Sequence, residues 1–168
     1  MGDVLRMADL LAEGDLIDFG PLPEAVNKIL QEGVAAYYDD RPSADGLFRQ
    51  ALEMAPAELP IYYCLYKIHT YQRNLDTAME AAEAGLAEAA RQAGLNADWR
   101  LWTPEDTRWV DDPPARFALY TLKAMAFIRL RRDDAPGAQV LLDRLSLLDP
   151  ADRIGHSVVA ALAARLLE

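Results

Sequence analysis

The chain contains a single cysteine, only two histidines and no apolar run long enough to cross a membrane. Because Cys64 has no second cysteine to pair with, an intramolecular disulfide is excluded, which fits a reducing compartment. A membrane-spanning helix needs about 18 or more consecutive apolar residues. The acidic N-terminus also lacks the apolar core of a secretory signal. We therefore expect a cytoplasmic protein that does not associate with a membrane.

Basic residues are also scarce. Lysine and arginine together number 17 against 27 acidic residues, which gives a net charge of −10. A phosphate backbone would be repelled by this charge, so we expect no nucleic-acid partner. The chain is nevertheless 52% hydrophobic over 168 residues. That is enough to build one domain with a sizeable core.

The motifs that position phosphates, nucleophiles or catalytic zinc are missing from the sequence. Cys64 and His69 would point about 140° apart around a helix axis, so we interpret them as a core thiol and a packed imidazole. Three acidic pairs are more typical of helix-capping turns than of a calcium loop: Asp39–Asp40, Asp111–Asp112 and Asp133–Asp134. We expect no catalytic residue, no cofactor and no metal site.

Apolar residues recur at three- and four-residue spacing almost throughout, whereas alternating β-branched residues are nearly absent. This periodicity predicts an all-α fold. Prolines stand at the starts of the periodic stretches or between them, because proline interrupts a helix. The predicted helices span residues 24–38, 43–54, 60–72, 75–92, 114–131, 135–147 and 152–167, with a weaker one near 6–12. The short turns between them predict antiparallel helical hairpins.

A small residue recurs in the second helix of successive hairpins, at Ala44, Ala78 and Ala138. The first two are 34 residues apart, a period typical of stacked helical hairpins. The last two are 60 residues apart, which is one period plus 26 residues. The excess contains a proline-broken stretch that holds all three tryptophans.

The hairpins resemble the tetratricopeptide-repeat family. The first carries its pattern in Gly33, Ala36, Ala44, Phe48, Ala51 and Pro56. The third carries it in Leu122, Met125, Ala126, Ala138, Leu142 and Pro150, and the second in Tyr62, Leu65, His69 and Ala78. Tyr66 replaces a small residue of the pattern, which predicts either an outward ring or a wider separation of the two helices.

The resemblance implies a right-handed stack of three hairpins in a single domain. Its parts are an N-terminal extension (1–22), repeat 1 (25–56), repeat 2 (59–92), an insertion (93–113), repeat 3 (114–150) and a capping helix (152–168). Asp152 is the expected N-terminal cap of the last helix. The apolar face of this last helix is predicted from the i, i+4 spacing of Ile154, Val158, Leu162 and Leu166.

Members of this family bind peptides or helices in a groove lined by the first helix of each hairpin. The resemblance implies groove residues that combine aromatic rings with two lysines: Tyr37, Tyr38, Tyr63, Lys67, Tyr71, Tyr120, Lys123 and Phe127. Such a surface suits an apolar or acidic segment of another protein. The alternative is that these aromatic rings pack between repeats.

The tryptophan-rich insertion has two interpretations. Burial of Trp99, Trp102 and Trp109 would anchor a long segment that has little helical propensity of its own. Alternatively, one or two of the indoles stay exposed as interface anchors, since tryptophan is enriched at binding hot spots. We favour the first interpretation.

The sequence therefore predicts a non-enzymatic adaptor that binds another protein. Two alternatives remain: a small acidic chaperone of the type III secretion class, and a homo-oligomeric scaffold that pairs through its last helix. The stretches CLYKIHTYQ and RFALYTLKAMAFIRLRR are similar to short repeat proteins found beside bacterial nitrogen-fixation genes. That resemblance implies a partner in nitrogenase maturation or its electron supply.

Overall fold

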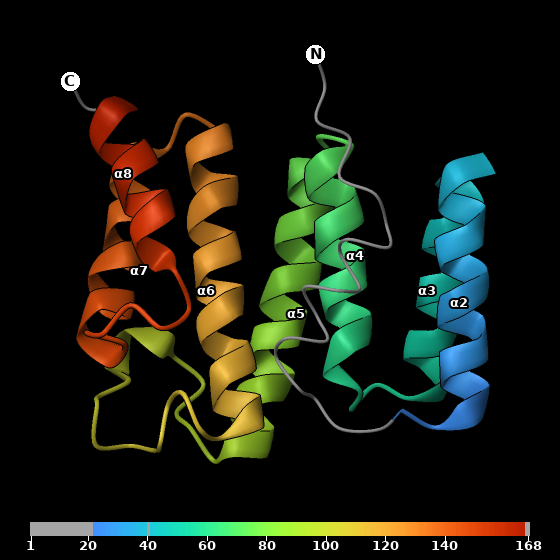
Figure 1. The fold of residues 1–168 in the computed structure, drawn as a ribbon, viewed down its shortest axis with the longest axis horizontal. Helices are drawn as coiled ribbons and strands as arrows, with labels where there is room; N and C mark the ends of the chain where they lie inside the picture. Colours follow the sequence, from blue (N-terminus) through green and yellow to red (C-terminus); the bar gives the residue numbers. More distant parts are fainter. Residues whose placement is uncertain (1–21, 40, 167–168) are drawn as a thin grey trace. The chain divides into compact units, whose positions relative to one another are not determined.

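The computed structural model describes residues 22–39 and 41–166, without the side chains of Tyr38, Asp39 and Arg41. Within these ranges the chain forms seven α-helices, one short 3-10 helix and no β-strand, which confirms the predicted all-α class (Figure 1). The helices are α2 (Glu24–Asp39), α3 (Arg41–Met54), α4 (Leu59–Tyr71), α5 (Leu75–Ala93), η1 (Trp99–Leu101), α6 (Pro113–Arg131), α7 (Ala135–Leu148) and α8 (His156–Leu166). The predicted helix near 6–12 and almost all of the predicted extension 1–22 lie outside the described residues.

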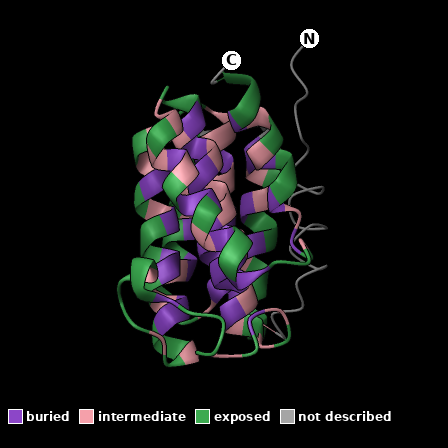
Figure 2. Cartoon of the chain, turned by 90° about the vertical axis from the view of Figure 1, so that its left-hand side faces the viewer, coloured by how far each residue is buried: buried purple, intermediate pink, exposed green. Residues whose placement is uncertain are grey.

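The chain divides into two compact units, residues 1–81 and 82–168. The boundary falls inside α5, so this helix gives its first part to unit 1 and its second part to unit 2. Helices α2 in unit 1 and α7 in unit 2 bury one side and expose the other, as their apolar periodicity requires. Figure 2 shows buried and exposed residues alternating along the helices nearest the viewer. In the described part of the chain, no helix combines the length and the hydropathy that a membrane crossing demands.

In unit 1, α2 packs closely against α3. Gly33 on α2 faces the ring of Phe48 on α3, and a Cβ atom at Gly33 would lie only 2.5 Å from Phe48 Cε1. Ala44, Phe48 and Ala51 are all fully buried. The absence of a side chain at Gly33 therefore sets how closely these two helices approach.

Helix α4 is buried over most of its surface. The Tyr66 ring is buried and packs edge-on against Tyr63, with 5.5 Å between ring centroids. Of the two alternatives predicted for Tyr66, the outward ring is therefore wrong, because the ring belongs to the mostly buried surface of α4. Cys64 is a core thiol as predicted, and burial raises its pKa to about 12.

The turns that follow α4 and α6 have the same backbone geometry. The N–H groups of Arg73 and Asn74 donate back to carbonyls of α4, and those of Asp133 and Asp134 donate back to matching carbonyls of α6, at 2.8 to 3.1 Å. Arg73 and Asp133 both take left-handed conformations, with φ of 64° and 59°. The hydrogen-bond pattern of one turn thus recurs 60 residues later in the other.

In unit 2, α6 packs against α7, and α8 packs against both. Helix α8 begins at His156 and not near residue 152, because Gly155 has a φ of +78° that interrupts helical geometry. The Asp152 carboxylate still accepts a hydrogen bond from the Ser157 N–H, at 3.1 Å.

The predicted apolar face of the last helix is wrong. Val158 is 73% exposed and Leu166 58% exposed, whereas Val159 and Ala163 are buried. The predicted row started from Ile154, which is buried but precedes the helix. The late start of α8 shifts the buried face by one residue.

Candidate functional site

The segment that connects α5 to α6 is held by two buried indoles. Trp102 and Trp109 are buried, with ring centroids 5.3 Å apart. Trp102 Nε1 donates to the Asn96 carbonyl at 2.7 Å, and Trp109 Nε1 donates to the Thr103 carbonyl at 2.9 Å. Each ring therefore buries its apolar surface while its one polar atom is satisfied by the segment's own backbone.

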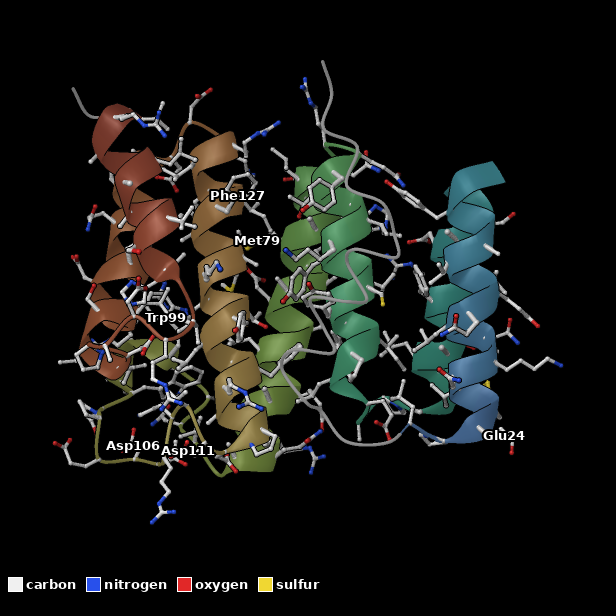
Figure 3. The ribbon with its side chains drawn as sticks, viewed as in Figure 1. Glu24, Met79, Trp99, Asp106, Asp111 and Phe127 are labelled. Atoms are coloured by element: carbon white, nitrogen blue, oxygen red, sulfur yellow. The ribbon has the colours of Figure 1, made fainter. Side chains whose placement is uncertain are left out.

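Arginines from the neighbouring helices attach the segment to unit 2. Arg144 of α7 donates to the Trp102 carbonyl at 2.8 Å, and Arg116 of α6 donates to the Val110 carbonyl at 3.2 Å. Asp106 and Asp111 lie at the outer edge of the segment and are exposed (Figure 3). The segment is thus a fixed part of unit 2 with an acidic outer edge.

Trp99 differs from the other two indoles because its ring is only partly buried. It opens the short helix η1, where the Asp98 carboxylate accepts a hydrogen bond from the Arg100 N–H at 3.0 Å. The Arg100 guanidinium lies over the Trp99 ring, 4.6 Å from its centroid. This stacked pair lies at the surface of unit 2.

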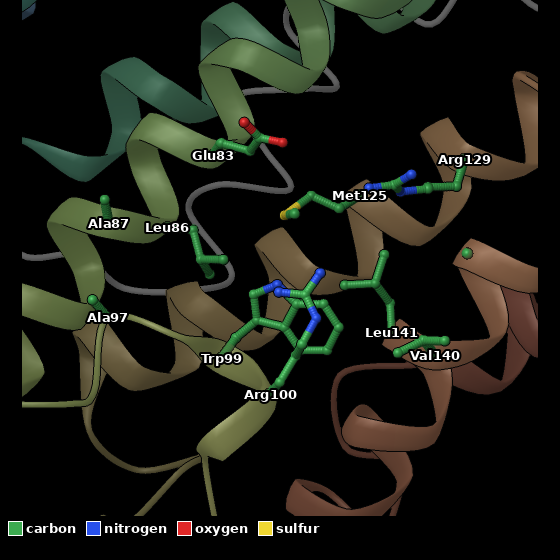
Figure 4. Close-up of a pocket in the computed structure, with 11 residues that line it drawn as sticks. Glu83, Leu86, Ala87, Ala97, Trp99, Arg100, Met125, Arg129, Val140 and Leu141 are labelled. Atoms are coloured by element: carbon green, nitrogen blue, oxygen red, sulfur yellow. The ribbon is translucent and has the colours of Figure 1, made fainter. Parts of the chain in front are cut away.

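Two hollows in unit 2 share Trp99, Arg100 and Val140 in their walls. The first has a volume of about 440 Å³ and charged rim residues Glu83, Arg100 and Arg129 (Figure 4). Its other lining side chains come from the second part of α5, the connecting segment, α6 and α7, and are mostly apolar: Leu86, Ala87, Ala97, Met125, Val140 and Leu141. The second hollow, of about 460 Å³, adds Asp143, Arg144 and Leu147 of α7.

The charged groups around these hollows are partly engaged with their neighbours. Arg129 forms an ion pair with Asp134 at 2.9 Å. The hydrogen bond from the Gly137 N–H, followed by that from Arg129, lowers the pKa of the Asp134 carboxyl. The Arg100 guanidinium lies 3.4 Å from the exposed Asp98 carboxylate, and its side chain is 60% exposed. Arg100 is therefore the cation of this surface that is most open to an incoming group.

Most of the groove residues predicted in unit 1 do not form an open surface. The rings of Tyr37 and Tyr63 are buried, and Lys67 and Tyr71 are partly buried. The Lys67 ammonium lies over the Tyr63 ring, 5.4 Å from its centroid. The side chain of Tyr38 lies outside the described residues.

The predicted groove residues of unit 2 lie on α6 and are partly buried: Tyr120, Lys123 and Phe127. The Lys123 ammonium donates to the Ile154 carbonyl at 3.1 Å, and it lies 5.6 Å from the Tyr120 ring centroid. Lys123 therefore holds the chain just before α8, which was not foreseen from the sequence.

Both histidines belong to hydrogen-bonded clusters. His69 is a packed imidazole as predicted, and its Nε2 lies 2.6 Å from Asp45 Oδ1. Burial raises the pKa of Asp45, but hydrogen bonds from His69 and Arg49 outweigh that effect and lower it. His156 Nε2 lies 3.0 Å from the Asp149 carbonyl.

His156 also forms a cluster with the carboxylates of Asp149 and Asp152, in which the possible ligand atoms lie within 4.8 Å of one another. Asp149 accepts hydrogen bonds from the N–H groups of Arg153 and Ile154. Asp152 accepts from Ser157, whose hydroxyl bond contributes most to a lowered pKa of that carboxyl. The cluster thus serves to fold the chain between α7 and α8.

The hollows beside Trp99 and Arg100 were missed from the sequence, where the only signal was the tryptophan cluster itself. Arg144 and Trp102, which fix the segment beside α7, are 42 positions apart in the chain. No family model, no curated protein and no solved structure matches the chain. The candidate site therefore rests on the geometry of unit 2 alone.

Proposed function

We propose that this protein is a non-enzymatic interaction module built from tetratricopeptide-like hairpins, which acts in the cytoplasm and binds a segment of another protein. The binding surface is the pair of hollows beside Trp99 and Arg100 in unit 2. The observation that carries this proposal is the half-buried indole, stacked with an exposed guanidinium, in the shared wall of two hollows that combine apolar and charged side chains. Tryptophan and arginine are the residue types most enriched at binding hot spots.

Two exposed apolar side chains lie at the same place. Among the described residues, six large hydrophobic side chains are exposed. Val140 and Leu147 line the hollows, and Leu101 directly follows Arg100. Exposed apolar side chains that line a hollow are typical of interaction sites.

The tetratricopeptide-like part of the proposal draws on two features. The small residues at the recurring positions Ala44, Ala78 and Ala138 are all fully buried. The turns after α4 and α6 repeat the same hydrogen bonds. Repeating units that bury small residues at fixed positions are characteristic of helical-repeat proteins.

The proposal places binding beside Trp99 and not along the row of tyrosines and lysines. Tyr63 is buried, and Lys123 is engaged by a backbone carbonyl of its own unit. A binding residue has to be available to its partner, and Arg100 and Val140, which line the hollows together with Trp99, are exposed.

Site-specific photo-crosslinking in the native cell tests the proposal. A photoreactive amino acid at Val140 is expected to capture a distinct polypeptide, and Trp99→Ala should abolish this capture. The same amino acid at Val158, an exposed apolar position on α8, is the matched control and should capture nothing specific. Absence of capture at Val140, or equal capture at Val158, would contradict the proposal.

A further inference from the structure

The residues of the second hollow that belong to α7 form a helical stripe. They are Val140, Asp143, Arg144 and Leu147, at spacings of three, four and seven residues. Val140 and Leu147 are 52% and 47% exposed, and two turns of helix separate them by about 10.5 Å along the axis. On an isolated globular unit this stripe would be the polar side of the helix.

Trp99 and Arg100 border the same hollow. The stripe of α7 and the stacked pair thus line one trough, in which Val140 and Leu147 supply apolar surface while Asp143, Arg144 and Arg100 supply charge. A partner helix that presents apolar side chains at i, i+3, i+4 and i+7 matches such a trough, because its side chains repeat with the period of the stripe.

The charged residues of the trough indicate which charge the partner segment carries. Arg100 and Arg144 line the second hollow together with Asp143, although the chain as a whole has a net charge of −10. Arg144 is engaged with the Trp102 carbonyl, and Asp143 accepts a hydrogen bond from Gln139. Arg100 keeps most of its edge open, since stacking on an indole uses the face of a guanidinium and not its N–H groups.

We infer that the partner segment is an amphipathic α-helix that lies along α7 and places one carboxylate against Arg100. This inference rests on the proposed function. The apolar side of the helix covers Val140, Leu147 and the exposed part of Trp99. Its carboxylate makes a charge-assisted hydrogen bond with Arg100, whose guanidinium is held in place by stacking on the Trp99 ring.

Synthetic peptides and the full-length chain test this inference by isothermal titration calorimetry. The probes are a panel of 21-residue amphipathic helices with leucine, isoleucine or phenylalanine on the apolar side and one glutamate beside it. We expect at least one of them to bind. Replacing its glutamate by glutamine should weaken binding about tenfold, the effect of losing one hydrogen bond to a charged group. A proline in its centre should abolish binding, because proline breaks the helix.

Protein variants separate the two interactions. Arg100→Gln should weaken the glutamate peptide about tenfold and leave the affinity for the glutamine peptide unchanged, since the carboxylate and Arg100 act on each other. Val140→Asp should abolish binding of both peptides. Arg165→Gln and Val158→Asp, at exposed positions on α8, are the matched controls and should change neither affinity.

Three results would overturn the inference: no binding by any peptide of the panel, equal affinity for the glutamate and glutamine forms, or undiminished binding of the proline form. If Val140 still captures a polypeptide in the cell, such a result leaves the proposed function standing and rejects only the acidic helix. If capture at Val140 also fails, both are rejected.

Discussion

The two units of the chain share the backbone geometry of one turn but differ in the side chains that pack between their helices. The turn after α4 in unit 1 and the turn after α6 in unit 2 share their hydrogen bonds and their left-handed residue. In unit 1 the interior of the first hairpin pairs Gly33 with Phe48. The positions that the repeat pattern predicts to correspond in unit 2 hold Ala126 and Leu142. Unit 2 alone adds a tryptophan-anchored segment beside its hairpin. The comparison teaches that the backbone tolerates several side-chain solutions, provided that the volumes at a close contact remain matched.

Removal of the buried Trp102 ring, which anchors the connecting segment of unit 2, should have the largest effect on the free energy of unfolding. Trp102→Ala is expected to lower the free energy of unfolding by about 3–5 kcal/mol, because it removes a fully buried ring. Trp99→Ala, at a partly buried ring of the same segment, should lower it by about 1 kcal/mol or less. Urea denaturation followed by circular dichroism measures both. Similar losses for the two variants would show that the segment is not anchored by Trp102.

A smaller effect is expected from a methyl group at the helix contact of unit 1. Gly33→Ala should destabilise the protein by about 1–3 kcal/mol, since its Cβ would lie 2.5 Å from the Phe48 ring. Adding Phe48→Leu, which reproduces the alanine–leucine pair of unit 2, should recover part of this loss. The same denaturation experiment applies.

Gly46→Ala is the matched control for that substitution. Gly46 lies in α3, and a Cβ atom there would meet nothing within 4 Å. The change should stabilise the protein by about 1 kcal/mol, the usual gain from replacing glycine in an exposed helical position. Destabilisation at Gly46, or no rescue by Phe48→Leu, would contradict the volume-matching account.

The smallest effect is expected at the turns. Asn74 in the turn after α4 and Asp134 in the turn after α6 occupy matching positions, and Asp134→Asn makes these two residues the same. The substitution should slightly destabilise unit 2 at about pH 7. The hydrogen bond from Gly137 and the charge of Arg129 lower the pKa of Asp134 in the folded state. Ionised Asp134 therefore stabilises the fold above its ordinary pKa of about 3.8, and this contribution is lost as the pH falls through the lower folded value.

Denaturation of the wild type and Asp134→Asn at about pH 7 and about pH 3 measures this difference. The difference in free energy of unfolding between the two proteins should be smaller at the lower pH. A difference that stays constant would mean that the carboxylate charge has no part in capping α7.

The helices could be predicted because prolines and apolar periodicity mark them locally. Pro60, Pro113 and Pro136 each fall in the first turn of a helix, where proline is compatible with helical geometry. The start of α8 could not be predicted, since apolar periodicity does not encode the left-handed conformations of Asp152 and Gly155 that precede it. These two residues delay the start of the helix, and the predicted apolar face is displaced with it.

The candidate site could be predicted only in part. Three tryptophans in one segment indicated an anchored structure, and the sequence left both burial and exposure open. The structure shows both burial and exposure: Trp102 and Trp109 are buried, while Trp99 remains partly exposed with Arg100 stacked on it. The segment is held beside α7 by the long-range hydrogen bond from Arg144 to the Trp102 carbonyl, and no local pattern encodes such a contact.

The distribution of chromophore and thiol has a practical consequence. Every indole lies in unit 2, and the one sulfhydryl lies in unit 1. Intrinsic fluorescence therefore monitors the melting of unit 2, while alkylation of Cys64, whose thiol has a pKa of about 12, monitors the opening of α4. One denaturation series read by both signals yields a separate stability for each half of the protein without any engineered label.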